Sequence, residues 1–542
     1  MAQVEKNAEV GQIDQLEKEG AVHLEHVQGL TSVKEWDQLR QDAIMAESLE
    51  RQITLRQAFK TYPTAIFWSF AISLCIIMEG YDTALLGSLY AEAAFRKKYG
   101  HYHAASGYQL EPKWQSGVSY GGTAGNIIGI FLVSEAQRRF GYIRTIQAAL
   151  IWLTGCIFIV FFSPSIQVLF IGELLSGLSF GAFSSSVVAY ASEITPVRLR
   201  GYLTTYVNLC WVIGQFIASG VLLGVQGRPD KWAYKIPFAV QWVWPVPLFI
   251  MASLAPESPW WLVRAGKLEH AERNVRRLAK VGENVDPKNT VAMMVRTNQH
   301  ELDNMPGVNF WDCFRGSNLR RTEIACLSWS IQVLAGSSFG NQGPFFFEQA
   351  GLSSTDAFKV TLGQRGLAFS GTCLSWVTMT YVGRRRVFLV GVFFLGLWLL
   401  LIGILAVPSR AGNKGAKWGQ TILVLLWVFT FDNSIAPIAY CIVGEVSATR
   451  VRVQTVGIAR NWYNVVTIGA GFINTYAINP TAWNWKGFEG FFWVPYYVST
   501  QALADMLPEM KGRTFRELDI LFERGVPARK FKTTIVTEEE DQ

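Results

Sequence analysis

Two carboxylates lie inside an apolar run near residue 80. Glu79 and Asp82 belong to the sequence Ile-Ile-Met-Glu-Gly-Tyr-Asp-Thr-Ala-Leu-Leu-Gly, which begins at Ile76. An acid at the centre of a bilayer costs roughly 2.5–3.5 kcal/mol on insertion scales, so such residues usually mark an ion or substrate path. A spacing of three places both side chains on one helix face, where one can hold a proton while the other stays charged. The pattern favours a proton-linked membrane carrier over two interfacial acids that extend to water.

Polar side chains also interrupt later apolar stretches. A sugar presents hydroxyl groups around a ring with apolar faces, so its site needs amides for the hydroxyls and aromatic rings for the faces. A buried amide must find partners on neighbouring helices, in water or on a ligand. Each such amide alone is equally well explained as a bond between helices, but together they favour a sugar site. The candidates are Gln215, Gln332, Asn461 and Asn464, with Tyr440 after the break that Pro437 predicts.

One arginine could complete a coupling site with the two acids. Arg460 lies within the predicted eleventh span and could face Glu79 and Asp82 across a central cavity. An opposite charge holds an acid ionised, so protonation of the acid would free the arginine and change which conformation is preferred. The alternative is that Arg460 extends to the cytoplasmic face, because Arg450 and Arg452 precede it by only ten and eight residues.

The composition is that of a membrane protein. Of the 542 residues, 50% are hydrophobic and only 17% are charged, against roughly 25% in soluble domains. Twelve spans of roughly 20 residues would use on the order of 240 positions, which the apolar half can supply. The net charge of +7 is modest and gives no reason to expect nucleic acid. We find no Walker loop, zinc pattern or serine nucleophile elbow, so we expect no enzyme, cofactor or metal. The seven scattered cysteines are interpreted as small hydrophobic residues.

Apolar stretches are arranged as six, a polar segment and six more, which predicts two halves with a path between them. No signal peptide is evident before the first stretch, which we expect to insert uncleaved. The predicted spans are 64–90, 115–134, 145–163, 168–191, 204–225, 236–255, 324–347, 358–382, 387–408, 419–444, 455–477 and 488–507. The predicted domains are an N-terminal tail (1–63), a first half (64–255), a central loop with short helices (256–323), a second half (324–507) and a C-terminal tail (508–542).

A constellation of acids and arginines recurs at the same place in both halves. Glu193-Ile-Thr-Pro-Val-Arg198-Leu-Arg200 follows the fourth span, and Glu445-Val-Ser-Ala-Thr-Arg450-Val-Arg452 follows the tenth. Such pairs can lock the halves together at one side and release them when the carrier turns inside out. Ordinary topogenic charge explains the arginines but not the glutamates, and it places this side, with both tails, in the cytoplasm. The predicted gate residues are Glu193, Arg198, Arg200, Arg384, Arg385, Glu445 and Arg450.

The chain resembles the sugar porters of the major facilitator superfamily over nearly all of residues 60–530. The motifs that carry the resemblance are PESPWWL at 256–262 and PEMKGRT at 508–514. GYDTALLGS, LRGYLTTYVNLCWVIGQFIASGVL, ARNWYN and NPTAWNWKG look closer still to fungal maltose and α-glucoside permeases. The resemblance implies an all-α twelve-helix fold, a plasma-membrane location and proton symport of an α-linked glucoside.

The resemblance also implies roles for single residues. Gln215 and Gln332 match positions where sugar porters place glutamines that bind hydroxyls. Asn461 and Trp462 resemble an Asn–Trp pair of the glucose transporters. The maltose permeases use an acid–acid–arginine cluster for proton coupling, which implies that role for Glu79, Asp82 and Arg460.

Three departures from the family pattern affect the expected site. Asn126 stands where these permeases usually have a glutamate, and an amide cannot carry a proton. Arg365 stands in the eighth span where an uncharged or aromatic residue is expected, so the site loses a negative charge and gains a positive one. The last span contains Pro495, Ser499, Thr500, Gln501 and Asp505, more polarity than a lipid-facing helix normally tolerates.

The sequence therefore favours a monomeric symporter that imports maltose-like α-glucosides with protons across a lipid bilayer. A second possibility is a carrier of another polyhydroxylated or secondary-metabolite substrate, including an exporter or an uncoupled carrier. A third is a sugar sensor that does not transport. Sensors are expected to have a long cytoplasmic C-terminal tail, and the short segment after Pro508 argues against that class.

Overall fold

The computed structural model describes residues 33–90, 92–103, 107–282, 285–304, 310–338, 347, 353–449, 451–478, 483, 485–495, 506–534 and 536. These residues belong to two compact units. One unit comprises Met1–Ala65 with Pro256–Gly307, and the other comprises Ile66–Ala255 with Val308–Gln542. The predicted halves thus share one unit, whereas most of the predicted central loop joins the segment that precedes the first span.

The smaller unit is a set of short helices. Thr54 begins α3 with a capping box, in which its side chain accepts from the Gln57 N–H and Gln57 bonds back to the Thr54 backbone. Helix α14 buries the face that carries Ala271 and Val275, and α2 packs against α15. The helices are α2 (Val33–Gln52), α3 (Leu55–Thr61), α13 (Pro259–Arg264), α14 (Leu268–Leu278) and α15 (Pro287–Asn304).

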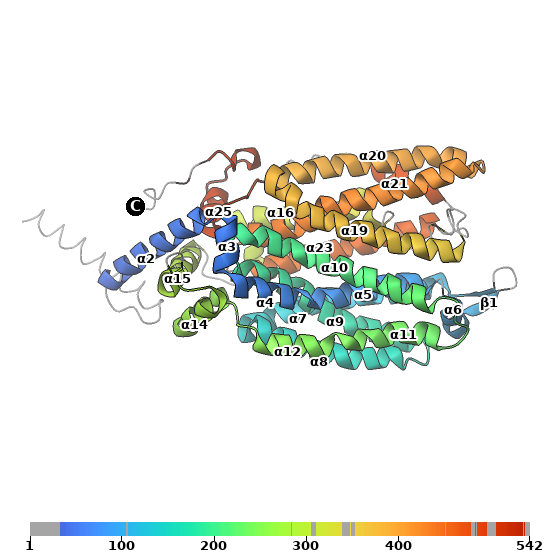
Figure 1. Cartoon of the computed structure of the whole chain (residues 1–542), viewed down its shortest axis with the longest axis horizontal. Helices are drawn as coiled ribbons and strands as arrows, with labels where there is room; N and C mark the ends of the chain where they lie inside the picture. The colour runs from blue at the N-terminus through green and yellow to red at the C-terminus, as the bar shows by residue number, and fades with distance from the viewer. Residues whose placement is uncertain are drawn as a thin grey trace, which may run out of the picture. The chain divides into compact units, whose positions relative to one another are not determined.

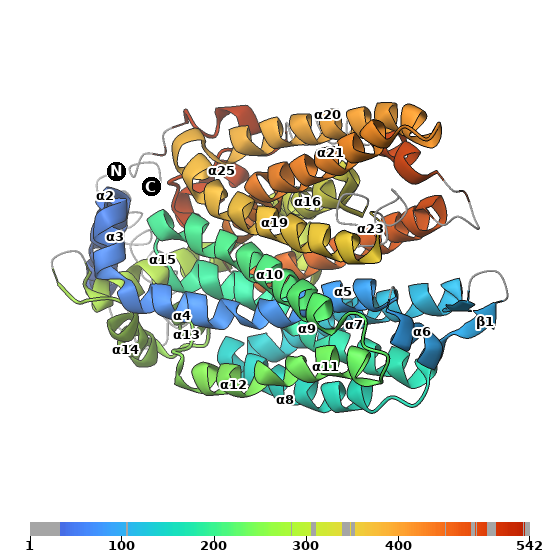
Figure 2. The same cartoon turned by 45° about the vertical axis from the view of Figure 1, so that its right-hand side comes forward.

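In the larger unit, the first-half helices and the second-half helices form two groups, with α10 and α19 side by side between them (Figure 1; Figure 2). The first group also carries a short antiparallel hairpin of β1 and β2. Its elements are α4 (Pro63–Ser73), α5 (Cys75–Leu89), α6 (Ala93–Tyr99), β1 (His101–His103), β2 (Gly107–Gln109), α7 (Pro112–Phe140), α8 (Tyr142–Phe161), α9 (Ile166–Ile194), α10 (Val197–Val225), α11 (Trp232–Val240), η1 (Gln241–Val243) and α12 (Pro245–Leu254).

The second group contains two broken helices. A π-helical turn with Gly336 at φ 89° follows α16, and a break at Ser434 separates α21 from α22. Its elements are η2 (Phe310–Phe314), α16 (Gly316–Gln332), η3 (Val333–Ser337), α19 (Ser354–Val382), α20 (Arg384–Arg410), α21 (Lys414–Asn433), α22 (Ile435–Val446), α23 (Arg452–Ile478), η4 (Lys486–Phe488), α25 (Phe515–Glu523) and η5 (Ala528–Lys530).

Seven described segments are long and apolar enough to cross a membrane by length and composition. Helices α7, α16, α19 and α23 occupy the predicted second, seventh, eighth and eleventh spans and are more polar along part of their surface. Buried polar residues on α7 and α23 explain the lower hydropathy, because these helices face other helices and not lipid alone. Most of the predicted twelfth span, including Ser499, Thr500, Gln501 and Asp505, lies outside the described residues.

Glycines bring α5 and α10 into close contact beside the two acids. A Cβ atom on Gly80 would lie 2.2 Å from the backbone oxygen of Trp211, and one on Gly214 would lie 2.2 Å from that of Ile77. Only glycine fits at such a crossing, which lets backbones approach as small residues do between membrane helices. The crossing fixes the part of α5 that carries Glu79 and Asp82.

Candidate functional site: buried ion pairs between the two halves

The centre of the site is an ion pair between α5 and α23. The Arg460 Nη2 atom donates to Glu79 Oε1 at 2.7 Å, and the two side chains are each about 5% exposed. Because α5 belongs to the first half and α23 to the second, this pair joins the halves directly. The structure therefore brings together two of the three residues that the sequence predicted for coupling.

Asn126 is part of the same network. Its Nδ2 atom donates to Glu79 Oε1 at 3.1 Å, and its Oδ1 atom accepts from Asn464 Nδ2 at 3.0 Å. The amide at the departure from the family pattern therefore stabilises the ionised form of Glu79, as a hydrogen-bond donor does. Asn464, predicted as a substrate ligand, bonds to another protein amide in this conformation.

Aromatic rings surround the Arg460 guanidinium. Its central carbon lies 4.8 Å from the Tyr463 ring centroid, 5.4 Å from that of Trp211 and 5.8 Å from that of Trp329. Tyr440 packs edge-to-face on Trp329 with 5.6 Å between ring centroids. These rings attract the cation and provide flat apolar surfaces beside it.

Asp82 lies one turn along α5 and has different partners. Gln241 Nε2, in the 3-10 turn η1, donates to Asp82 Oδ1 at 2.9 Å. The carboxyl group of Glu173 on α9 is the neighbouring acid, and both acids are buried. No described lysine or arginine forms an ion pair with Asp82. Asp82 acts on Glu79 through its charge and is not itself bonded to Arg460 among the described residues, so its predicted part in proton coupling stays a prediction.

Arg365 also has an acidic neighbour that the sequence analysis missed. It is buried on α19 and faces Asp432, which lies just before the break between α21 and α22. Asn208 on α10, in the other half, also lies beside Asp432. The positive charge of Arg365 therefore has a negative neighbour in Asp432.

The other predicted substrate residues differ in burial and partners. Asn461 is buried and donates to the Ile127 carbonyl at 3.4 Å, while its Oδ1 atom has no partner in the described part of the chain. Gln332 is buried at the end of α16, and the same holds for its Nε2 atom. Gln215 is half-buried, whereas Trp462 is 50% exposed and lies two residues, or about 200° of helix, away from Arg460.

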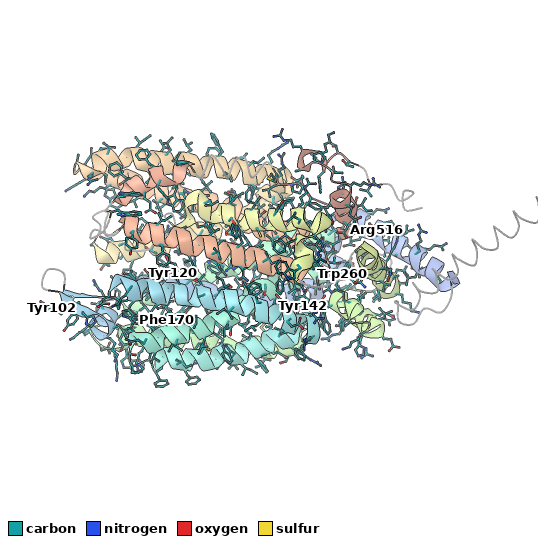
Figure 3. The ribbon with its side chains drawn as sticks, turned by 180° about the vertical axis from the view of Figure 1, so that it is seen from behind. Tyr102, Tyr120, Tyr142, Phe170, Trp260 and Arg516 are labelled. Carbon is teal, nitrogen blue, oxygen red and sulfur yellow. The ribbon has the colours of Figure 1, made fainter. Side chains whose placement is uncertain are left out.

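A second ion pair between the halves lies near the start of α23. Arg452 Nη1 lies 3.4 Å from Glu193 Oε1, and the Tyr142 hydroxyl donates to the same oxygen at 3.0 Å. Tyr142 marks the end of the larger unit opposite Tyr102, whereas Tyr120 and Phe170 lie toward the Tyr102 end (Figure 3). We refer to the end of the larger unit that contains Tyr142 and Glu193 as the Glu193 end.

The arginines that follow the predicted second and eighth spans bond to different acids in the two halves. In the second half, Arg384 bonds to Glu445 at 2.8 Å with both side chains buried. In the first half, Arg138 and Arg139 instead bond to Glu135, whose pKa these hydrogen bonds lower to about 2. The Glu135 side chain is 45% exposed and lies one residue beyond the predicted second span.

Three of the four remaining predicted gate residues, Arg198, Arg200 and Arg385, are described by the structure. The Arg200 guanidinium lies 3.5 Å from the centre of the Phe515 ring, and Arg452 lies 3.9 Å from it. Phe515 begins α25, so a C-terminal helix contacts arginines of both halves. The Arg385 backbone N–H donates to Glu509 at 3.2 Å, and Arg198 is exposed. Arg450 lies outside the described residues.

Comparison with known proteins identifies the family. Residues 68–522 match the family described as "Sugar (and other) transporter". The chain belongs to this family. It is 39% identical over 509 residues to the maltose permease MAL61 of Saccharomyces cerevisiae, covering 92% of this chain and 82% of that protein. It is 37% identical over 504 residues to a general alpha-glucoside permease of the same organism, covering 91% and 81%.

Solved structures show the fold of this family member. The chain matches the major facilitator proton:xylose symporter XylE bound to 6-bromo-6-deoxy-D-glucose with a TM-score of 0.73. The match has 19% identity and covers 85% of this chain and all of that chain. An inward-open form of XylE from E. coli matches with a TM-score of 0.60. The predicted all-α, twelve-helix major facilitator fold is confirmed, and the chain is a multi-pass membrane transporter.

Sequence reasoning missed four polar residues of the site: Glu173, Gln241, Asp432 and Asn208. Glu173 and Asp432 are lone acids inside predicted apolar spans, so the rule that singled out Glu79 could have found both. Gln241 and Asn208 carried no comparable signal, because their partners lie on other helices far away in sequence.

Proposed function

We propose that this sugar transporter family member imports α-glucosides such as maltose together with protons. The names of the yeast permeases with 37–39% identity support the substrate class. The observation that carries the coupling is the buried Glu79–Arg460 pair between the halves. A symporter needs a proton-binding group whose charge state changes how its halves contact each other, and this pair is such a group.

The proposed coupling step follows from charge. With Glu79 ionised, the Arg460 bond and the Asn126 bond hold α5 against α23. A proton on Glu79 removes the Coulombic attraction, so α23 can move relative to α5. Release of that proton on the other side restores the pair. Glu79 Oε2 has no hydrogen-bond partner among the described residues, so this oxygen can receive the proton.

The sugar would bind beside this pair. Asn461 Oδ1 and Gln332 Nε2 are buried polar atoms without protein partners, so one can accept from a sugar hydroxyl and the other can donate to one. Trp329 lies one turn before Gln332, and with Tyr440 it offers aromatic surfaces for the apolar faces of a sugar ring. Asn464 can contribute when its bond to Asn126 exchanges for a bond to the substrate.

The Glu193 end is the proposed cytoplasmic side. The arginines that support this orientation include Arg138, Arg139, Arg200 and Arg452 at helix ends, in agreement with the positive-inside rule. The predicted domains keep their boundaries in this proposal, with the central loop and both tails inside the cell. We place the transporter in the plasma membrane as a monomer with no enzymatic activity.

Uptake by proteoliposomes tests this proposal. A panel of labelled maltose, other α-glucosides, hexoses and polyols is offered with and without an inward proton gradient. We expect maltose-like sugars to accumulate only with the gradient and to leave when a protonophore is added. Accumulation of none of the α-glucosides by folded protein would contradict the proposed substrate class, and gradient-independent uptake would contradict the coupling.

A further inference from the structure

A pair of buried acids lies apart from every described arginine and lysine. Glu173 on α9 is 1% exposed and Asp82 on α5 is 6% exposed. Their carboxyl groups are neighbours, and Gln241 donates to Asp82 from the other side. Neither carboxyl belongs to an ion pair among the described residues, in contrast to Glu79.

Glu173 is buried beside Asp82, and an ionised Asp82 carboxylate cannot donate a hydrogen bond to it. Both of its carboxylate oxygens are enclosed and receive no hydrogen bond from a protein donor. Two ionised carboxylates cannot hydrogen-bond to each other, because each only accepts. A hydrogen bond between them forms only when one carries a proton.

Electrostatics favours one shared proton. Two adjacent negative charges in a medium that excludes water repel each other strongly, so such carboxyl pairs ionise only once near neutral pH. Gln241 supplies one donor to Asp82, which favours Asp82 as the ionised member and Glu173 as the protonated one.

The surroundings do not supply a compensating cation. Helix α5 packs against α7, α9 and α10, and no described residue on α7 or α10 adds a charge next to either carboxyl. The titratable groups that face the pair are an acid, two phenols and a thiol, and each is neutral or negative: Glu79 and Tyr81 on α5, Tyr90 directly after it, and Cys156 on α8.

We propose that Asp82 and Glu173 form a second proton-binding site, which holds one proton between two carboxyls and is distinct from the Glu79–Arg460 pair. The proton is shared in a carboxyl–carboxylate hydrogen bond between α5 and α9. The site needs no sugar and no gradient, so it is independent of the proposed transport function.

Infrared spectroscopy of the full chain in lipid nanodiscs, without substrate, tests this site. The carbonyl stretch of a protonated carboxyl is separate from the stretches of a carboxylate. At neutral pH we expect Glu173→Gln to remove one protonated carboxyl per chain, because both amides then donate to Asp82 and keep it ionised. Asp82→Asn should shift or remove the same band, since the partner of Glu173 changes.

The matched control is Glu193→Gln, the same isosteric change on the same helix. Glu193 is bonded to Arg452 and Tyr142 and, among the described residues, to neither Asp82 nor Glu173, so the band should remain. A band unchanged in both Glu173→Gln and Asp82→Asn overturns the proposal, and if one variant fails to fold, the other decides. Loss of the wild-type band when Na⁺ replaces choline would show a metal cation at the pair and would also overturn it.

Discussion

Helix α23 carries two arginines that each bond to an acid of the other half, and their surroundings differ. Arg460 meets Glu79 at 2.7 Å among aromatic rings and amides, and one Glu79 oxygen has no partner. Arg452 meets Glu193 at 3.4 Å, where Tyr142 and the Phe515 ring add further contacts. The difference suggests that the same pair of residue types serves two purposes. We propose that the first pair exchanges a proton, whereas the second has several partners that hold it together.

The largest expected effect comes from Arg460→Leu. Removing one partner of a buried ion pair leaves an uncompensated charge and costs about 3–5 kcal/mol, unless the acid takes up a proton. We expect proton-driven sugar accumulation to fall to background. The thermal unfolding midpoint should fall as well, when measured on purified protein.

The double variant Arg460→Leu with Glu79→Gln separates coupling from stability. Its thermal midpoint should recover, because no charge remains buried, but accumulation should stay at background. Normal accumulation in the single variant would show that Arg460 does not take part in coupling.

Glu193→Gln should give the next largest effect, and it should change the rate of sugar exchange and not its coupling to protons. A hydrogen bond to a charged group contributes about 1.5–3 kcal/mol, so weakening this one should favour opening at the Glu193 end by about tenfold or more. We expect faster sugar counterflow with the accumulation ratio at equilibrium retained. Counterflow in proteoliposomes, compared with Glu135→Gln at the exposed cluster as control, measures this. Loss of accumulation with unchanged counterflow would show that coupling depends on the Glu193–Arg452 pair, which contradicts its assignment to Glu79 and Arg460.

The contrast between these sites also shows which parts of the fold and of the site can be predicted from the sequence. Apolar spacing and the family motifs predicted the fold and the Glu79–Arg460 pair, because both depend on residue types that are rare within membrane helices. The same information grouped Asp82 with them, since a spacing of three says which face a side chain is on but not which neighbour it meets. Asp82 meets Glu173 and Gln241, and only the packing of α5 against its neighbours determines that.

The repeated constellation shows the same limit at the Glu193 end. The recurring acids and arginines predicted a gate at one side but not which acid each arginine would bond to. Arg384 bonds to Glu445 within the second half, whereas Arg138 and Arg139 bond to Glu135 and Arg452 bonds to Glu193 across the halves.

Asn126→Glu should have a smaller effect, confined to the central pair. Asn126 donates to Glu79, and a carboxyl in its place can do so only when protonated. The repulsion between two adjacent carboxylates favours that proton, so we expect proton-driven uptake to persist to a more alkaline outside pH. The pH profile of initial uptake rate tests this, with Asn126→Gln as the control that adds no titratable group. An unchanged profile would mean that residue 126 does not affect the proton on Glu79.

Thr533→Cys should leave transport unchanged and report on orientation. Thr533 is exposed after the short helix η5, in the predicted C-terminal tail. If the Glu193 end faces the cytoplasm and the last span crosses, an impermeant thiol reagent should label this cysteine only after cells are permeabilised. Labelling in intact cells would reverse the assignment of the tail and contradict the predicted crossing.

The central claim is that Glu79 binds the transported proton, and proton movement during sugar entry tests it most directly. In weakly buffered proteoliposomes, maltose entry through the wild-type protein should draw protons in and make the outside alkaline. Glu79→Gln should still exchange labelled maltose for unlabelled maltose, with no proton uptake, whereas Glu193→Gln should keep both. Proton uptake in proportion to maltose entry through Glu79→Gln would contradict the account.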